Sequence, residues 1–532
     1  MIIRKPLPRA HGLHEPLRHP DHPKPRTRRE FLSQGFISGG AMAFVPSIVA
    51  WMLANPRVAN ALSNDINQLK GPCKISSGSG VPFISFDLSG GANLVGSEVM
   101  VGGPGGQTDF LSTAGYGKLG LPGNMAPISS APGTFIDASA GLLFHSDSAI
   151  MRGMKTRMSA ATLANVNGVV IPALSQNDTA NNVWSPLYAI AKTGTKGSLL
   201  TLAGTSNSPS GGNSVALMSM IDASIAPTKI SQPSDLVGLA PGGSGTSLFT
   251  GPTAKADMVS TVEFIERVSL LKLALPTVST GLSTTVTPPA TLSPEGLAKQ
   301  QVQCSYARPA NTAEVLSGPK DLDPLQDVNI TGAANSIFSA TEITQGDFMK
   351  TAAIMKLIVN GFGGAATIQM GGFDYHSGNR SDGETRNFNA GVCIGACLEY
   401  AARVGHPLML QVFSDGSLNS NMTIDNSAAG RGKLSWQGDN QSTAATFFLV
   451  YSPNGRPPLL GADKQQLGWF TTDGSVMASS SPAANAVNLA VELITLNYLG
   501  LNGRAAEMPT LFPGTAFGSA ALIDKYTAFG AI

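Results

Sequence analysis

Short apolar runs alternate along this chain with longer stretches in which apolar residues recur every three or four positions. The short runs are typical of buried strands and lie at residues 81–87, 165–174, 365–370, 407–413 and 444–451. The helical spacing occurs at residues 258–275, 348–359, 389–404 and 484–499. Strands that alternate with helices predict an α/β fold with a mainly parallel sheet flanked by helices.

Loops rich in Gly, Ser and Pro separate these elements. Residues 100–140 form one such loop, and residues 277–294 are rich in Thr, Ser and Pro, which predicts a flexible excursion at the surface. With 60 Gly, 35 Pro and only 13% charged residues, the composition argues against a coiled coil, a long helical repeat and acidic disorder. We therefore expect residues 62–532 to form a single large α/β domain.

The first 61 residues have the features of an export signal. A basic segment contains the pair Arg28 and Arg29, an apolar stretch follows at residues 36–54, and small residues at 59–61 are typical of a cleavage site. The paired arginines resemble a twin-arginine signal, which implies recognition by the twin-arginine export machinery and transport of a folded protein. We therefore expect a bacterial protein that is periplasmic or secreted.

Removal of this leader changes the charge of the protein. The leader holds nine of the 35 Lys and Arg residues and three of the 34 Asp and Glu residues, so 26 bases and 31 acids remain. A mildly acidic protein with only 6% aromatic residues is not expected to bind nucleic acid. The apolar run at 41–54 is shorter than the roughly 20 residues of a spanning helix, so we expect no stable membrane insertion after cleavage.

Four cysteines suit an oxidising compartment, which permits disulfides. Cys73 and Cys304 are a candidate disulfide pair. Cys393 and Cys397 are four residues apart on a predicted helix, so we interpret them as small core residues, with a metal-binding pair as the alternative.

Polar residues follow several of the predicted strands. Asp87 ends the first strand, Asp374 and His376 come after the run at 365–370, and Asp415 ends the run at 407–413. Ligands of open α/β sheets bind beyond the carboxyl ends of the strands, so these residues predict a site for a hard cation or an acid/base pair. The alternative is that each Asp only forms a turn or caps a helix.

A block of residues resembles a known family of exported bacterial proteins. Residues 371–377 read GGFDYHS, and one helix later residues 408–416 read LMLQVFSDG. Domain-of-unknown-function family 1501 has a similar pattern: Gly-Gly, an aromatic residue and Asp-Thr-His after a strand, then a strand that ends in an acid. Its early Gly-rich turn has a counterpart at residues 88–93, which read LSGGAN.

This resemblance implies a distant relation to the alkaline phosphatase and sulfatase superfamily, in which a parallel sheet carries metal ligands on loops at its strand ends. Asp87 and Asn93 are alternatives for the early ligand of that superfamily. Together the resemblance implies seven candidate metal ligands: Asp87, Asn93, Asp374, His376, Asp415, Asp439 and Asn440.

The chain departs from that superfamily where histidine ligands are expected. Gly416 and Asn440 stand at two of those positions, and only His145, His376 and His406 follow the leader. The remaining candidates are mostly oxygen ligands, which suit calcium or magnesium better than zinc. The resemblance therefore implies one divalent cation, or an altered site that binds none.

The candidates for a nucleophile and for substrate-binding residues come from less specific sequence patterns. Ser175 and Thr179, and also Ser97, are candidates for the alcohol nucleophile that the superfamily uses, although each reads more readily as a structural hydroxyl. Arg380 and Arg386 follow His376 and are candidates to bind an anionic ester. Two hypotheses follow. We favour an exported protein with an altered metal site and a binding role, and the alternative is a metal-dependent hydrolase of phosphate or sulfate esters.

Overall fold

The computed structural model describes eight stretches of the chain, all within its second structural unit, residues 60–532. The described residues are 63–70, 80–127, 134–175, 182–239, 254–275, 277–288, 291–316 and 321–532. The predicted leader, with Arg28 and Arg29, lies outside these residues, as do Cys73 and Thr179.

Seven strands form one sheet in the order β4-β11-β8-β1-β7-β5-β6. Their bounds are β1 Phe83–Leu88, β4 Val166–Pro172, β5 Leu200–Gly204, β6 Thr228–Lys229, β7 Gly363–Met370, β8 Leu408–Ser414 and β11 Ala445–Tyr451. β11 runs antiparallel to its neighbours β8 and β4, and the other strand pairs are parallel. This arrangement confirms the predicted α/β class with a mainly parallel sheet flanked by helices.

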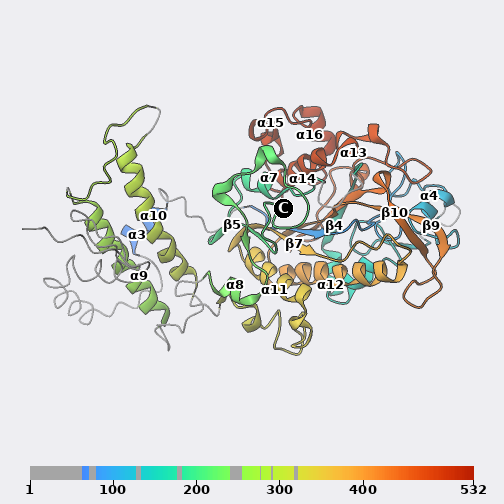
Figure 1. Ribbon diagram of the computed structural model, residues 1–532, viewed down its shortest axis with the longest axis horizontal. Coiled ribbons are helices and arrows are strands. Elements are labelled where there is room, and N and C mark those ends of the chain that lie inside the picture. The colour runs from blue at the N-terminus through green and yellow to red at the C-terminus, as the bar shows by residue number, and fades with distance from the viewer. Residues whose placement is uncertain are drawn as a thin grey trace, which may run out of the picture. The chain divides into compact units, whose positions relative to one another are not determined.

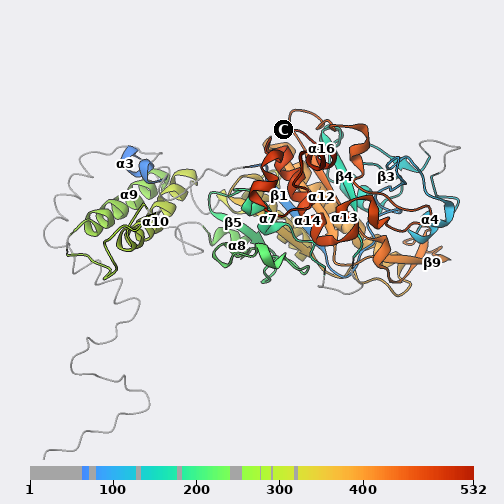
Figure 2. The ribbon, with the colours of Figure 1, turned by 90° about the horizontal axis from the view of Figure 1, so that it is seen from above.

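Helices cover both faces of this sheet because successive residues of a strand point to opposite sides. Ile84 and Phe86 belong to the hydrophobic core under α11 (Gly346–Val359), α12 (Arg380–Val404) and α5 (Ala149–Lys155). Phe83 belongs to the core under α7 (Leu187–Lys192) and α14 (Val487–Leu501). Figure 1 shows α11 and α12 along one face, with α7 and α14 along the other, and Figure 2 shows the same part of the molecule from the side of α7 and α14.

Shorter elements complete this part of the molecule. The helices are α4 Thr113–Lys118, α6 Ala160–Ala164, α8 Pro233–Val237, α13 Pro482–Asn485, α15 Met508–Leu511 and α16 Ala520–Tyr526. Two antiparallel ribbons pair β9 (Leu418–Ile424) with β10 (Leu434–Asp439) and β2 (Ile136–Asp137) with β3 (Phe144–His145).

A second group of helices consists of α3 (Asn64–Asn67), α9 (Ala254–Leu273) and α10 (Pro294–Val315). The Ser63 hydroxyl donates to Glu263 of α9 at 2.7 Å, and Arg267 of α9 pairs with Asp65 of α3 at 2.8 Å. Residues 277–288 of the predicted excursion link α9 to α10 without regular structure, and their side chains are exposed. Cys304 of α10 is disulfide-bonded.

The two edge strands of the sheet, β6 and β4, differ in length and in what covers their outer side. β6 is only two residues long and contains Lys229. The outer edge of β4 is paired with residues 466–467, because Leu467 N–H donates to Val170 O at 3.0 Å and Gln466 bridges the same strand. Within the described ranges, no helix is both long and apolar enough to cross a bilayer.

Candidate functional site

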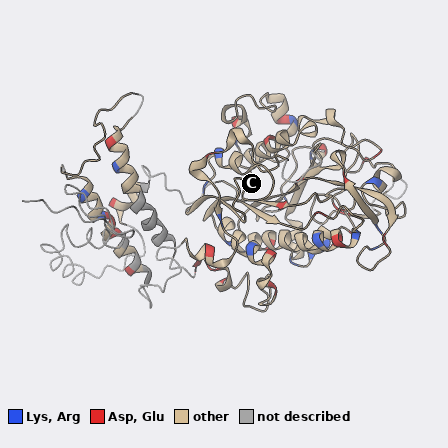
Figure 3. Cartoon of the chain, in the orientation of Figure 1, with Lys and Arg blue, Asp and Glu red and all other residues tan. Residues whose placement is uncertain are grey.

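The carboxyl ends of β1, β7 and β8 meet at one edge of the sheet. Leu88 lies beside Met370 on one side and Ser414 on the other, so Asp87, Asp374 and Asp415 all emerge at this edge. Most of the sheet carries no charge (Figure 3), and within its seven strands the charged residues are Asp87 and Lys229.

Asp87 is completely buried and is held by the loop that follows β5. Its Oδ2 atom accepts the backbone N–H groups of Asn213 at 2.6 Å and Ser214 at 2.8 Å. Gly212 permits this approach, since a Cβ there would lie 2.5 Å from the same oxygen. One carboxylate oxygen therefore already binds two donors from this chain, which is the number of its lone pairs.

Asp415 is also completely buried and faces donors on three loops. Its Oδ1 atom accepts Gly90 N–H at 2.8 Å, and its Oδ2 atom accepts the Asn213 side-chain amide at 2.5 Å. The Asn182 amide donates to the Asp415 backbone carbonyl at 2.6 Å. Asp415 therefore ties the ends of β1, β4 and β5 to the end of β8.

The neighbouring residue, Ser414, fixes the glycine turn after β1. Its hydroxyl accepts the N–H groups of Gly91 at 3.1 Å and Ala92 at 2.7 Å, and donates to Leu88 O at 2.5 Å. Three consecutive N–H groups of this turn thus bind side chains of residues 414 and 415. Such a concave row of N–H groups is a common binding site for anions, and here the protein's own side chains occupy it.

The pKa of Asp87 is raised to about 7, because burial and the nearby charge of Asp415 outweigh the hydrogen bonds from Ser214 and Asn213. Both effects disfavour the charged carboxylate. Asp87 therefore retains its proton over a pH range in which an exposed Asp would be ionised.

Asp374 and His376 lie at the same edge but face solvent. Their side chains are 60% and 41% exposed, and the Asp374 carboxylate contacts His376 Nδ1. The backbone of Asp374 touches the turn after β1 at Gly90 (φ +130°), where a Cβ would lie 2.3 Å from Asp374 N. The structure thus brings the loops of Asp87, Asp374 and Asp415 together, with one Asp exposed and two buried.

The two candidate arginines occupy different environments. Arg380 is 1% exposed, pairs with Glu384 at 2.7 Å and lies over the Trp436 ring at 4.7 Å. Arg386 is exposed, and its guanidinium packs against Gly372. Of the two, Arg386 is the one available to a ligand from solvent.

The other predicted ligands have separate surroundings. Asp439 is exposed, and its Oδ1 would lie 3.8 Å from a Cβ at Gly91. Asn440 caps a turn by accepting Ser442 N–H at 2.9 Å. Asn93 is buried, and its amide donates to Leu418 O at 2.9 Å.

The described candidates for a nucleophile are both buried. Ser175 is 6% exposed, and its N–H donates to Gln441 O at 3.1 Å. Ser97 is completely buried in a turn, where its N–H donates to Val95 O at 3.0 Å. Across the described part of the chain, neither hydroxyl has a hydrogen-bond partner.

The buried pair does not fit a divalent cation in this arrangement. Calcium and magnesium need carboxylate lone pairs directed at the ion, whereas N–H groups bind the oxygens of Asp87 and Asp415. Among the residues that the structure describes, no three His, Cys, Asp or Glu side chains form a group that could hold a metal. No reaction step through a metal is derived from this site.

The donors Asn182, Asn213 and Ser214 were not predicted from the sequence. They lie in loops after β4 and β5, and residues 205–214 consist mostly of Ser and Gly with no apolar spacing. The apolar run at 200–204, followed by this polar stretch, was the one signal that could have indicated another strand end.

A second buried group of charges lies between α12 and β10. Glu384 pairs with Lys433 at 2.7 Å and with Arg152 at 2.6 Å, in addition to Arg380, and Lys433 is completely buried. Burial alone would raise the pKa of Glu384, but the charges of Arg380 and Lys433 outweigh it and lower that pKa. Burial and the charge of Glu384 raise the pKa of Glu98 in the same group.

The cysteines of α12 lie in the core as expected. Cys393 and Cys397 are completely buried and free, and burial raises the pKa of the Cys393 thiol to about 12. Cys304 is disulfide-bonded, and its predicted partner Cys73 lies outside the described residues. In comparisons with known proteins, the chain matches no family model, no curated protein and no solved structure.

Proposed function

We propose that this chain is an exported binding protein with an alkaline phosphatase-like fold, in which the ancestral metal site has become a closed structural cluster. The twin-arginine-like leader and the order of the motifs at 88–93, 371–377 and 408–416 support this proposal. In this proposal the exposed side chains at the strand ends, Asp374, His376 and Arg386, contact the ligand.

One observation carries the proposal: the carboxylate oxygens of Asp87 and Asp415 are bound by N–H groups of two loops, those that follow β1 and β5. A cation on this pair would have to displace Gly90, Asn213 and Ser214, whose hydrogens point at the same oxygens. A raised pKa has the same consequence, because a protonated Asp87 is a poor ligand for a cation.

The test is a thermal-shift titration of the mature protein with calcium, magnesium and zinc, together with the Asp87→Asn variant. We expect no metal to raise the Tm of the parent protein. The variant should fold, because an Asn oxygen can still accept the N–H groups of Asn213 and Ser214 while its amide faces the hydroxyls of Ser89 and Ser214, which can accept.

Asp374→Asn is the matched control, since it neutralises an acid at the same edge that is exposed. A Tm that rises by several degrees with one metal, and no longer rises in Asp87→Asn, would show that the buried pair is a metal site and would overturn the proposal.

A metal-dependent hydrolase of phosphate or sulfate esters is the second candidate. The contact between Gly90 and the backbone of Asp374 favours it, because it places acids from three strand ends around one turn. Assays with p-nitrophenyl phosphate and p-nitrophenyl sulfate, with each metal added, distinguish the candidates. Hydrolysis that Asp374→Asn abolishes without a change in Tm would replace the binding function with the enzymatic one.

A further inference from the structure

A pocket lies at the opposite edge of the sheet, at the amino ends of β1, β7 and β8. Its volume is about 240 Å³, and it is bounded by the chain before each of these strands, at Pro82, Gly361 and Pro407. This volume is somewhat below the about 300–1,000 Å³ of sites for larger ligands, which suits a small molecule.

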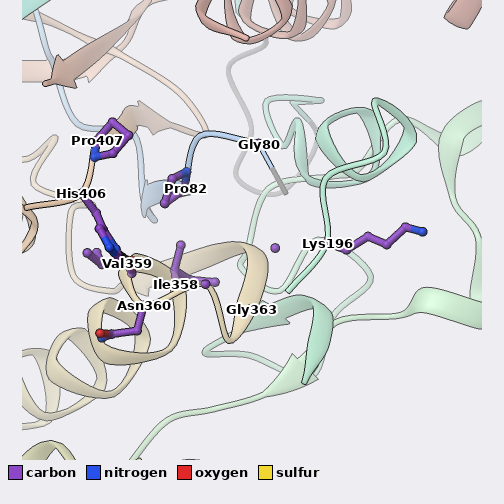
Figure 4. A pocket seen from close by; sticks show the side chains of 11 residues that line it. Gly80, Pro82, Lys196, Ile358, Val359, Asn360, Gly363, His406 and Pro407 are labelled. Atoms are coloured by element: carbon purple, nitrogen blue, oxygen red, sulfur yellow. Dashed lines mark hydrogen bonds between the residues drawn. The ribbon is translucent and has the colours of Figure 1, made fainter. Parts of the chain in front are cut away.

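The lining combines an apolar floor with two basic side chains. Pro82 and Pro407, which are partly exposed, supply apolar surface, and Lys196 and His406 supply nitrogen atoms. Figure 4 shows His406 beside Val359 and Pro82, with Lys196 on the opposite side of the pocket and its ammonium directed outward. The lining residues, all of which the structure describes, include neither Asp nor Glu.

His406 is fixed in one orientation by the end of α11. Its Nδ1 lies 2.7 Å from Val359 O, and since a carbonyl only accepts, Nδ1 must carry the proton of this hydrogen bond. Its second nitrogen, Nε2, donates to an anion only when the ring carries a second proton, and the ring is exposed. Fixing one ring nitrogen in this way selects the atom that a ligand meets.

The carboxyl ends of two helices lie near the pocket, and their partial negative charge opposes the positive charge of the basic side chains. α11 ends at Val359 and α12 ends at Val404, and the carboxyl end of a helix carries partial negative charge. Carbonyls in their last turns are already bound, however: Leu357 O accepts Phe362 N–H, and Ala401 O accepts His406 N–H. The full charge of Lys196 therefore outweighs the helix ends.

We propose that this pocket binds a small organic anion, with its acidic group between Lys196 and the protonated ring of His406 and a compact apolar body against Pro82 and Pro407. The stem of Lys196 has four rotatable bonds, so its ammonium can turn from the outward position toward a bound anion. This site is separate from the cluster of Asp87 and Asp415, and the proposal does not depend on the proposed function.

Fluorine NMR of the mature protein with three probes tests the proposal. The probes are 4-fluorobenzoate, 4-fluorophenyl phosphate and the neutral 4-fluorobenzyl alcohol. We expect one or both anions to bind and the alcohol to bind weakly, and the two anions show whether the site takes a carboxylate or a phosphate monoester.

Two variants locate the binding. Lys196→Met removes the charge and keeps the stem, and His406→Asn keeps a donor for Val359 O while removing Nε2. Each should weaken binding of the anion by about fivefold or more, because a charge-assisted hydrogen bond is lost. Lys229→Met removes an exposed lysine of β6 that is outside the pocket, and it should bind as the parent does.

Equal binding of the alcohol and the anions would overturn the proposal, as would parental affinity in Lys196→Met or the absence of binding at millimolar probe. If His406→Asn fails to fold, Lys196→Met decides the question, because the Lys196 side chain forms no hydrogen bond with any residue that the structure describes.

Discussion

Two groups of buried acids in this molecule are stabilised by different means. Asp87 and Asp415 are held by neutral N–H groups, whereas Glu384 is held by Arg380, Lys433 and Arg152. The pKa of Asp87 is raised and that of Glu384 is lowered, although both are buried. The partner therefore decides whether a buried acid keeps its charge. A neighbouring cation preserves the charge, whereas neutral donors beside a second acid do not.

Lys433→Met should change the stability of the protein more than any other variant considered below. It leaves Glu384 with fewer cations in a buried setting, and we expect the free energy of unfolding to fall by about 3–5 kcal/mol. Urea unfolding measures this loss. Lys350→Met, which removes a partly exposed ion pair with Asp347, is the control and should cost less than about 1 kcal/mol. Equal losses in the two variants would contradict the distinction.

Asp87→Asn should change how the free energy of unfolding depends on pH. The native state keeps the Asp87 proton up to about pH 7, whereas the unfolded chain releases it near pH 4, so the native state binds more protons in between. The stability that Asp87 contributes is therefore complete below pH 4 and is lost as the pH rises through 7. Relative to the parent, Asp87→Asn should gain about 4 kcal/mol between pH 4 and pH 8.

Unfolding of both proteins at several pH values gives this difference directly. Taking the difference cancels the other groups that titrate, among them Glu98. A constant difference across this range would mean that Asp87 is ionised in the native state.

Asp415→Asn tests whether the donors around the pair are matched to carboxylates. In either orientation of the new amide, its NH₂ group meets a donor, Gly90 N–H or the Asn213 amide. We expect a loss of about 1–2 kcal/mol in chemical unfolding, because one buried donor loses its acceptor. A variant as stable as the parent would indicate that these loops readjust freely.

Asp374→Asn should have the smallest effect. The contact with His376 is open to water, and exposed ion pairs contribute at most about 1 kcal/mol. A Tm within about one degree of the parent is expected. A large fall in Tm would show that Asp374 belongs to the structural cluster instead of the accessible surface.

The sheet was predictable because its strands are apolar and short. Six residues of β1, for example, are all buried, and Asp87 interrupts an otherwise apolar or small set. Parallel strands end at the same edge of a sheet, so the sequence alone predicted that Asp87, Asp374 and Asp415, at the ends of β1, β7 and β8, share one edge.

Burial at the site could not be predicted, because it depends on loops without periodicity. Asn213 and Ser214 reach Asp87 only through the path of residues 205–214. Arg380 was expected in a loop since its helix was predicted to begin at residue 389, and α12 in fact begins at Arg380. The first turns of α12 are mostly polar because they contact the buried charged side chains of Glu98 and Lys433.

The two edge strands of the central sheet affect whether this protein aggregates when it is concentrated. An outer strand with a long row of open backbone groups can recruit the same strand of another molecule and start aggregation. Here β6 is too short to serve as such a template and carries a lysine, and residues 466–467 pair with the outer side of β4. Both edges of the sheet thus resist strand addition by another molecule, which disfavours aggregation at high protein concentration.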